Sequence, residues 1–173
     1  SKVVTNNKKT LAVRFPNHPL TRSLLKKIKY PLAAPSANIS SKISPVSKKD
    51  VIEEFGKKIK FILDGGQSKI GVESTIISLV DKPQILRIGG LEKSKINNFL
   101  NLNMKLSNKK NKIKVPGQEK VHYSPGIPIR MNVKRPRQSE AFILIKKKGI
   151  SVKHSFYLSK KGNLKEVAKN LYK

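Results

Sequence analysis

The feature that most constrains the fold is a long break in the hydrophobic pattern, between residues 101 and 138. This segment is rich in Lys, Asn, Pro and Gly and shows little periodicity, as is typical of a linker. On both sides of it, short strand-like runs alternate with amphipathic helical segments, which predicts an α/β fold in each part. The expected regions are therefore an α/β portion at 1–100, an interdomain linker at 101–138 and the start of a second α/β portion at 139–173.

Strands are predicted where apolar runs lie between turn signals. These runs are Thr10–Phe15, Leu32–Pro35, Lys60–Leu63, a part of Ile70–Val80, Gln84–Ile88, Ala141–Ile145 and His154–Leu158. Helices are predicted from apolar side chains at helical spacing, together with residues that favour helix starts. The expected helices follow Asn17 or His18, Ser47, Gly90 and Asn163. Ser47 and Asp50 have the spacing of a capping box, and Gly56 is expected to end that helix.

Composition excludes several classes of protein. The chain has no cysteine, so disulfides and thiolate metal sites are ruled out. Its three histidines, His18, His122 and His154, are far apart in sequence, which argues against a histidine metal site. The longest apolar run, Ala141–Ile145, is far too short to span a membrane. No signal peptide is recognised, and the expected compartment is the cytoplasm.

The formal net charge of +28 has two compatible explanations. One is a polyanionic partner such as tRNA, bound through its phosphates. The other is mutational bias, since lysine supplies 32 of the 38 basic residues and arginine only 6, beside abundant Asn and Ile. Arginine is the residue favoured for bidentate recognition of bases and phosphates. The composition therefore favours the bias without excluding the partner.

Residues 33–40, with the sequence Ala-Ala-Pro-Ser-Ala-Asn-Ile-Ser, are the most informative segment. They follow a predicted strand end, where α/β proteins place ligand sites. In an extended loop Ser36 and Asn38 point the same way, so a hydroxyl and a carboxamide would enter one site. A loop that closes on its own backbone explains the same residues, and taken alone it is the better explanation.

Two arginines stand out for a different reason. Arg14 lies in the middle of a predicted strand between apolar neighbours, so a partly buried guanidinium there needs an anionic partner. The partner is either a structural carboxylate or the carboxylate of a substrate. Arg87 precedes Ile88 and two glycines, where a ligand can come close to the backbone. Ser74 and the turn at Asp64-Gly65-Gly66 are weak signals by themselves.

Taken in order, these segments resemble the YrdC-like family of threonylcarbamoyl-AMP synthases. The matching runs are Ala12–Leu20, Ala34–Ser40, Ser44–Pro45, Leu63–Gly66, Gly71–Ile76 and Ile85–Gly89. The resemblance resumes at Pro116-Gly117 and at His122–Pro125, which look like the linker of the two-domain branch. Residues 156–171 look like its small C-terminal domain. The implied fold is α/β: the C-terminal part of a YrdC-like twisted open sheet with flanking helices, a linker, and part of a small Rossmann-like domain.

The resemblance also implies a reaction and a site. L-threonine, bicarbonate and ATP would give threonylcarbamoyl-AMP and pyrophosphate, with Mg²⁺ held mainly through the phosphates; downstream enzymes would then modify tRNA. The implied ATP-binding residues are Thr10, Ser36, Asn38, Ser44, Arg87, His122 and Tyr123. The implied threonine-binding residues are Arg14, Ala34 and Ser74. No catalytic side chain and no metal ligand is implied, because catalysis of this kind rests on positioning and on neutralising phosphate charge.

One departure from the family pattern bears on activity. The family's Lys-x-Arg motif for the ATP phosphates precedes the first matching residue, and no strand-associated Lys-x-Arg occurs in this chain. The chain also begins at Ser1 rather than Met and ends in a predicted helix. We therefore expect a fragment, truncated at both ends, that carries part of a site and is inactive alone.

Two other functions fit parts of the sequence. One is the YrdC-like domain of a carbamoyltransferase, against which the His122–Pro125 segment and the second domain argue. The other is a non-catalytic basic RNA-binding module, which the charge alone supports. Aromatic residues make up only 6% of the chain, so a base-stacking platform is not evident.

Overall fold

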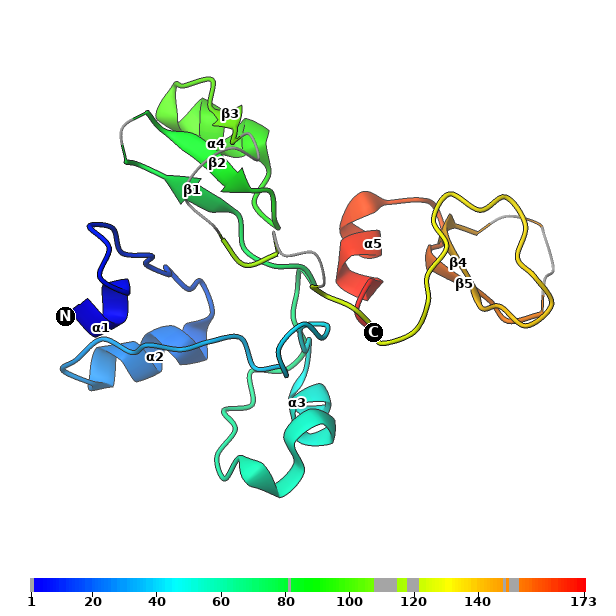
Figure 1. Cartoon of the computed structure of the whole chain (residues 1–173), viewed down its shortest axis with the longest axis horizontal. Helices are drawn as coiled ribbons and strands as arrows, with labels where there is room; N and C mark the ends of the chain where they lie inside the picture. The colour runs from blue at the N-terminus through cyan, green and yellow to red at the C-terminus, as the bar shows by residue number, and fades with distance from the viewer. Residues whose placement is uncertain (1, 81, 108–114, 118–121, 148, 150–152) are drawn as a thin grey trace.

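The computed structural model describes residues 2–80, 82–107, 115–117, 122–147, 149 and 153–173. Figure 1 shows the secondary structure as separate groups around a junction of connecting segments. The groups are α1 (Lys2–Thr5) and α2 (Pro19–Lys27); α3 (Lys48–Phe55) and the 3-10 turn η1 (Gly56–Lys58); β1 (Ile76–Ser78), β2 (Gln84–Arg87), α4 (Lys93–Leu100) and β3 (Lys105–Leu106); and β4 (Phe142–Lys146), β5 (Ser155–Ser159) and α5 (Leu164–Asn170). The α/β class predicted from the sequence is confirmed.

The first sheet has the strand order β1-β2-β3, and most of the buried hydrophobic side chains lie in it or in the residues between β2 and β3. β1 and β2 are antiparallel, whereas β2 and β3 are parallel and are joined through α4. Ile85 of β2, Ile96 of α4 and Met104 form one buried cluster. Asn97 accepts a hydrogen bond from the Met104 amide at 3.1 Å. The tight packing of Met104 explains why a short strand follows at Lys105, inside the segment predicted as a linker.

The second sheet is a parallel pair, β4 and β5, with α5 following directly. Ser159 ends β5 and is 1% exposed. Its hydroxyl donates to Glu166 at 2.6 Å and accepts from the amides of Gly162 and Asn163 at 2.9 Å each. The Asn163 side chain in turn caps α5. One buried serine therefore joins the strand end, the turn and the helix start, as expected for a small α/β unit.

The predicted helix signals are confirmed. Ser47 and Asp50 form both hydrogen bonds of a capping box, at 2.9 and 3.3 Å, and α3 begins at Lys48. Gly56 ends α3 with φ +52°, a conformation that strains residues with a side chain. Pro19 occupies the first turn of α2, where its missing N–H costs nothing. Local hydrogen bonds thus set these boundaries.

Three predicted strands are wrong: Thr10–Phe15, Leu32–Pro35 and Lys60–Leu63 have no strand structure. Their side chains face solvent, with Phe15 94% and Phe61 91% exposed. A strand is stabilised by a paired backbone and by cross-strand neighbours rather than by its own sequence. No described segment pairs with these runs, so they stay extended. The expected partial burial of Arg14 is wrong for the same reason.

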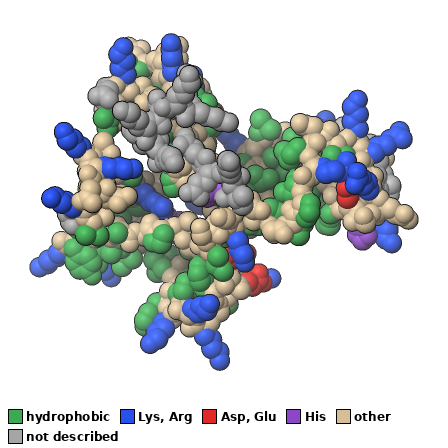
Figure 2. All heavy atoms as spheres, viewed as in Figure 1, with side chains coloured by type: hydrophobic (Ala, Val, Ile, Leu, Met, Phe, Trp, Pro, Cys, Tyr) green, Lys and Arg blue, Asp and Glu red, His purple; other side chains and the backbone are tan. Residues whose placement is uncertain are grey.

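The accessible surface shows how open the chain is. It measures 15385 Å² for 19.4 kDa, whereas a compact monomer of this mass exposes about 8,500 Å². The surface is thus roughly 1.8 times that of a compact protein. Apolar side chains are part of it, and Figure 2 shows them gathered in patches on the visible face.

Basic side chains project from each group of elements on the face shown in Figure 2, and acidic ones are sparse. The positive charge is therefore dispersed on this face rather than concentrated in one stripe. Among the helices of the described ranges, none has the length and apolar character needed to cross a bilayer.

A bidentate ion pair fastens the residues before β4. Arg130 donates to both carboxylate oxygens of Glu140, at 2.7 and 2.5 Å, and the Arg137 amide donates to the same carboxylate at 2.8 Å. The Arg130 hydrogen bonds, followed by the Arg137 amide, lower the pKa of Glu140 to about 2. The contact therefore joins part of the predicted linker to the start of the second sheet.

This pair gives a pH-dependent prediction. Because the folded-state pKa of Glu140 lies below the ordinary value of 4.5, its stabilising contribution is complete above pH 4.5 and is lost as the pH falls toward about 2. We expect the Glu140 carboxyl ¹³C resonance to titrate near pH 2. Amides around residues 130–140 should shift in the same range, and Glu140→Gln should abolish that transition. A Glu140 pKa near 4.5 would contradict the pair.

Candidate functional site

Arg87, at the end of β2, is the centre of the candidate site. Its Nε and Nη2 donate to the Ser74 carbonyl oxygen at 3.1 and 2.9 Å. Its Nη1 donates to the Pro116 carbonyl at 3.0 Å and to the Tyr123 hydroxyl at 3.1 Å. Four of the five guanidinium N–H groups are therefore used. One half-buried side chain at the end of β2 therefore joins the segment before β1 to the region predicted as a linker.

Thr75 and Gly89 hold the segment before β1 against the segment after β2. The Thr75 hydroxyl donates to the Leu91 carbonyl at 2.6 Å and accepts from the Gly89 amide at 3.0 Å. A side chain at position 89 would overlap the Glu73 carbonyl oxygen and the Ser74 backbone. Gly89 is therefore required by the close approach of two backbones, whereas the sequence had suggested the close approach of a ligand there.

Tyr123 brings the predicted linker into the site. Its ring lies edge-on to His122, with centroids 4.0 Å apart. A Cβ at Gly117, whose φ is +93°, would stand 3.2 Å from the Tyr123 ring. Burial and, to a lesser degree, the nearby Glu73 carboxylate raise the pKa of Tyr123, while Arg87 opposes the shift. The hydroxyl therefore stays protonated near neutral pH.

The loop that contains Ser36 and Asn38 contacts the His122–Ser124 segment through Ser41. Asn38 Nδ2 donates to the carbonyls of Ile39 and Lys42 at 2.9 and 3.0 Å, which closes the loop on itself. The Ser41 carbonyl then accepts the Ser124 amide at 2.8 Å. The self-closing loop weighed from the sequence is thus observed, and it also contacts the segment that carries His122 and Tyr123.

Three buried polar atoms have no hydrogen-bond partner among the described residues. They are Asn38 Oδ1, Glu73 Oε1 and His122 Nδ1. Buried polar groups are almost always paired, so each such atom needs an explanation. All three lie in motifs identified from the sequence, and the contacts of Arg87, Tyr123 and Ser124 connect those motifs. A bound ligand would satisfy atoms of this kind.

Other predicted site residues are not brought into this cluster. Arg14, Ala34 and Ser36 are exposed, and Thr10 and Ser44 are half-buried. Within the described ranges, none of these side chains makes a hydrogen bond or ion pair. Their expected roles toward ATP or threonine stay predictions.

Two residues of the cluster were not assigned a role from the sequence. Glu73 was quoted only as part of the motif Gly71–Ile76, and Tyr172 lies beyond the last helix. The Tyr172 hydroxyl donates to Glu73 Oε2 at 3.5 Å, and its ring centroid is 6.1 Å from that of Tyr123. Neither side chain has a local sequence signal, because their contact joins positions 99 residues apart.

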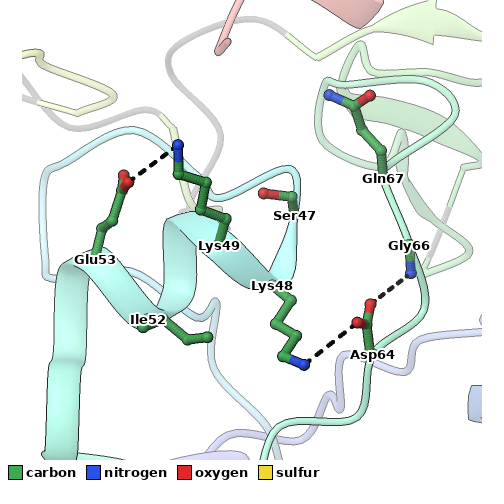
Figure 3. Close-up of a pocket in the computed structure, with 8 residues that line it drawn as sticks. All are labelled: Ser47, Lys48, Lys49, Ile52, Glu53, Asp64, Gly66 and Gln67. Atoms are coloured by element: carbon green, nitrogen blue, oxygen red, sulfur yellow. Dashed lines mark hydrogen bonds and ion pairs between the residues drawn. The ribbon is translucent and has the colours of Figure 1, made fainter.

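A separate hollow of about 560 Å³ lies between α3 and the turn at Asp64–Gln67 (Figure 3). Its cations already have partners, with Lys48 3.5 Å from Asp64 and Lys49 3.6 Å from Glu53. Asp64 also accepts the Gly66 amide at 3.0 Å, which lowers its pKa. The hollow contains none of the residues predicted to bind ATP or threonine, and it is a weaker candidate than the Arg87 cluster.

Comparison with known families gives two matches that together cover the chain. Residues 1–89 match the Sua5/YciO/YrdC family model, described as telomere recombination. Residues 81–173 match the model described as threonylcarbamoyl-AMP synthase, C-terminal domain. The chain belongs to the Sua5/YrdC family. The two matched ranges overlap and do not separate a linker, so the boundaries at 100 and 138 stay predictions.

Curated relatives within this family are named threonylcarbamoyl-AMP synthase. The Pyrococcus abyssi relative is 36% identical over 193 residues, which cover 99% of this chain and 56% of the relative. The Bacillus subtilis relative is 37% identical, over 81% of this chain and 42% of the relative. The Schizosaccharomyces pombe relative is 36% identical, over 98% and 41%. This chain thus spans about half the length of the family members it matches.

Solved structures of the family agree with the fold. The structure of P. abyssi Sua5 in complex with L-threonine superposes with a TM-score of 0.81 at 33% identity, covering 99% of this chain and 56% of that one. A variant of the same protein, with a histidine and the adjacent tyrosine changed to alanine, gives a TM-score of 0.72 at 31% identity, covering 99% and 55%. The arrangement in Figure 1 therefore agrees with that of the corresponding part of P. abyssi Sua5.

Proposed function

We propose that this chain carries part of the site of an L-threonylcarbamoyl-AMP synthase, which forms threonylcarbamoyl-AMP and pyrophosphate from L-threonine, bicarbonate and ATP. The observation that supports this most is the set of unpartnered buried atoms, Asn38 Oδ1, Glu73 Oε1 and His122 Nδ1, in motifs that the contacts of Arg87, Tyr123 and Ser124 connect. Their number and chemistry suit a ligand rich in hydroxyl and N–H groups, such as a nucleoside beside an amino acid.

The proposed reaction needs no covalent bond between a side chain and the substrates. Threonine and bicarbonate give a carbamate, one oxygen of which forms a bond to the α-phosphorus of ATP while the bond to pyrophosphate breaks. Arg87 supplies a fixed positive charge beside the ligand atoms, which is worth more than a mobile surface lysine. We further propose that Mg²⁺ is held mainly by the phosphates of ATP.

We assign the nucleotide side to Thr10, Ser36, Asn38, Ser44, Arg87, His122 and Tyr123, and the threonine side to Arg14, Ala34 and Ser74. The L-threonine bound to P. abyssi Sua5 supports threonine as a substrate. The direct contact between Arg87 and the Ser74 carbonyl supports a nucleotide side that lies next to the threonine side. His122 and Tyr123 would cover the nucleotide and exclude water from a reactive mixed anhydride.

We further propose that the product feeds enzymes that modify tRNA and that the protein acts in the cytoplasm. The dispersed positive charge would give weak, salt-dependent contacts with tRNA rather than sequence recognition. A basic module without catalysis would bind tRNA equally well in the presence or absence of the small substrates, which separates the two possibilities.

The test uses a chimera in which the part of the P. abyssi protein that precedes its match is fused upstream of Ser1. We expect mass spectrometry to detect an adduct of AMP with threonine and bicarbonate-derived carbon. The adduct should disappear when threonine, bicarbonate or ATP is omitted. A chimera that folds and binds ATP, yet forms no adduct, would contradict the proposed reaction.

Replacing Arg14 by Ala in the chimera should weaken threonine binding selectively. Loss of one partner of a charged, hydrogen-bonded pair costs about 2–5 kcal/mol, so the Kd for threonine should rise at least about 30-fold. The Kd for ATP should change less than about threefold. Calorimetry with each ligand measures both. Arg22→Ala, an exposed arginine of α2, is the matched control. Equal losses for the two ligands would make Arg14 a structural residue.

A further inference from the structure

The last helix lies directly against the segment that precedes β1. A Cβ placed on Gly71 would stand 2.5 Å from the Ala168 carbonyl oxygen and 2.6 Å from the Lys169 Cα. These atoms are backbone, so they cannot move aside as the end of a long side chain would. Gly71 is buried and has φ +81°. The absence of a side chain at this position thus permits α5 to touch the chain two residues before Glu73.

Two further contacts reinforce this position of α5. Tyr172, just past the helix, donates to Glu73 Oε2 at 3.5 Å and lies beside Tyr123. Lys165 Nζ is 3.9 Å from Glu92 Oε1, just before α4. The second contact is exposed and therefore adds little stability. Burial and the adjacent Glu73 carboxylate raise the pKa of Tyr172 to about 12, so its hydroxyl stays a donor at neutral pH.

We propose that Tyr172 is a positioning residue of the substrate site, through which α5 holds Glu73 and Ser74 in the place where Arg87 can bind the Ser74 carbonyl. The geometry carries the argument in three steps. The Tyr172 hydroxyl lies 3.5 Å from Glu73 Oε2, a long hydrogen bond; Glu73 is covalently linked to Ser74; and the Ser74 carbonyl accepts two N–H groups of Arg87. The C-terminal domain thereby becomes part of the apparatus that arranges the threonine side of the site.

The inference deepens the proposed function and rests on it for its kinetic consequence. It also explains why Glu73 Oε1 is left without a partner while Oε2 is engaged. A carboxylate held by one oxygen presents the other at a fixed place, where a ligand N–H or O–H can donate to it. Restraint by a distant helix costs little entropy at the moment of binding, which is the value of preorganisation.

A matched pair of glycine variants tests the docking of α5. Gly71→Ala and Gly66→Ala both place a side chain at a left-handed backbone, with φ +81° and +74°. Only Gly71 faces another backbone, because nothing lies within 4 Å of a Cβ at Gly66. The two variants therefore share the same kind of backbone strain, and only Gly71→Ala also creates a steric clash with α5. Spin labels on Lys95→Cys in α4 and on Lys161→Cys, between β5 and α5, report the distance between these two elements. The chain has no cysteine of its own to interfere.

We expect a narrow distance distribution for the labelled chain and for Gly66→Ala, and a longer, broader one for Gly71→Ala. A broad distribution in the chain with both glycines intact would overturn the docking. This measurement needs no catalytic activity, so its outcome is independent of the proposed function.

Kinetics of the chimera test the positioning role. Tyr172→Phe keeps the ring and removes the hydroxyl, and we expect KM for threonine to rise roughly 3- to 10-fold with kcat nearly unchanged. KM for ATP should change less than twofold, and Lys169→Ala, whose side chain is exposed, should leave all three constants unchanged. Unchanged threonine KM in both Tyr172→Phe and Gly71→Ala would show that α5 is only an interdomain contact. An inactive parent chimera would instead contradict the proposed function.

Discussion

With threonine, bicarbonate, ATP and Mg²⁺ present, this chain alone should release pyrophosphate no faster than buffer, whereas the chimera should turn over. The physical reason is charge placement. The polyphosphate needs cations fixed in position, and the chain has no strand-associated Lys-x-Arg to provide them. Its many surface lysines act as mobile, screened charges and cannot substitute. The difference should be at least a thousandfold, on the order of the effect of removing a fixed electrostatic contact.

The control is a chimera whose added segment carries alanine at both basic positions of its Lys-x-Arg. That protein should have the same exposed surface as the active chimera but lack the turnover, which separates missing charge from poor folding. Equal pyrophosphate release by the chain alone and by the chimera would show that the essential site is already complete within these 173 residues.

The second large effect is expected from Arg87→Ala. The substitution removes the donors that join Ser74, Pro116 and Tyr123. Hydrogen bonds to a charged group contribute about 1.5–3 kcal/mol each. Of the acceptors left behind, the Tyr123 hydroxyl is part-buried, whereas the Ser74 and Pro116 carbonyls are exposed. If local opening becomes easier by about 2–3 kcal/mol, amides near residues 71–75 and 115–117 should exchange roughly 30- to 150-fold faster. Hydrogen-exchange mass spectrometry measures this directly.

Arg87→Lys and Arg22→Ala make the result interpretable. Lysine retains the charge but cannot reach three acceptors in a planar fork, so we expect most of the increase in exchange to remain. Arg22→Ala removes an exposed arginine and should change nothing in these peptides. Exchange that is unaffected by Arg87→Ala would mean that the hydrogen bonds contribute no net stability to this junction.

Features governed by near neighbours in sequence were predictable. The Ser47 capping box, the Gly56 helix end and the Asn163 cap depend on residues within a few positions, and each is confirmed. The strands β2, β4 and β5 were also found, because each has a partner within the described chain. The Arg87 cluster was partly predictable, since Ser74, Arg87 and Tyr123 belong to motifs that together identify the family.

Features governed by distant partners were not predictable. The apolar run at Thr10–Phe15 predicts a strand, but no described segment pairs with it, so Val13 and Phe15 lie in solvent. The burial expected for Arg14 fails with the strand that was to provide it. Tyr172 was missed because its partner, Glu73, lies 99 residues away and no local pattern marks Tyr172.

The tyrosine pair at the junction gives this chain an optical property of its own. The sequence has four tyrosines and no tryptophan, so near-ultraviolet emission comes from tyrosine alone. Two of the four, Tyr123 and Tyr172, lie together beside the Glu73 carboxylate, and the other two, Tyr30 and Tyr157, are exposed. A carboxylate that accepts a phenol proton quenches the phenol's emission. Separation of α5 from the segment around Glu73 should therefore increase the tyrosine fluorescence of the unlabelled protein. The contact between Tyr172 and Glu73 can thus be followed in a simple fluorimeter.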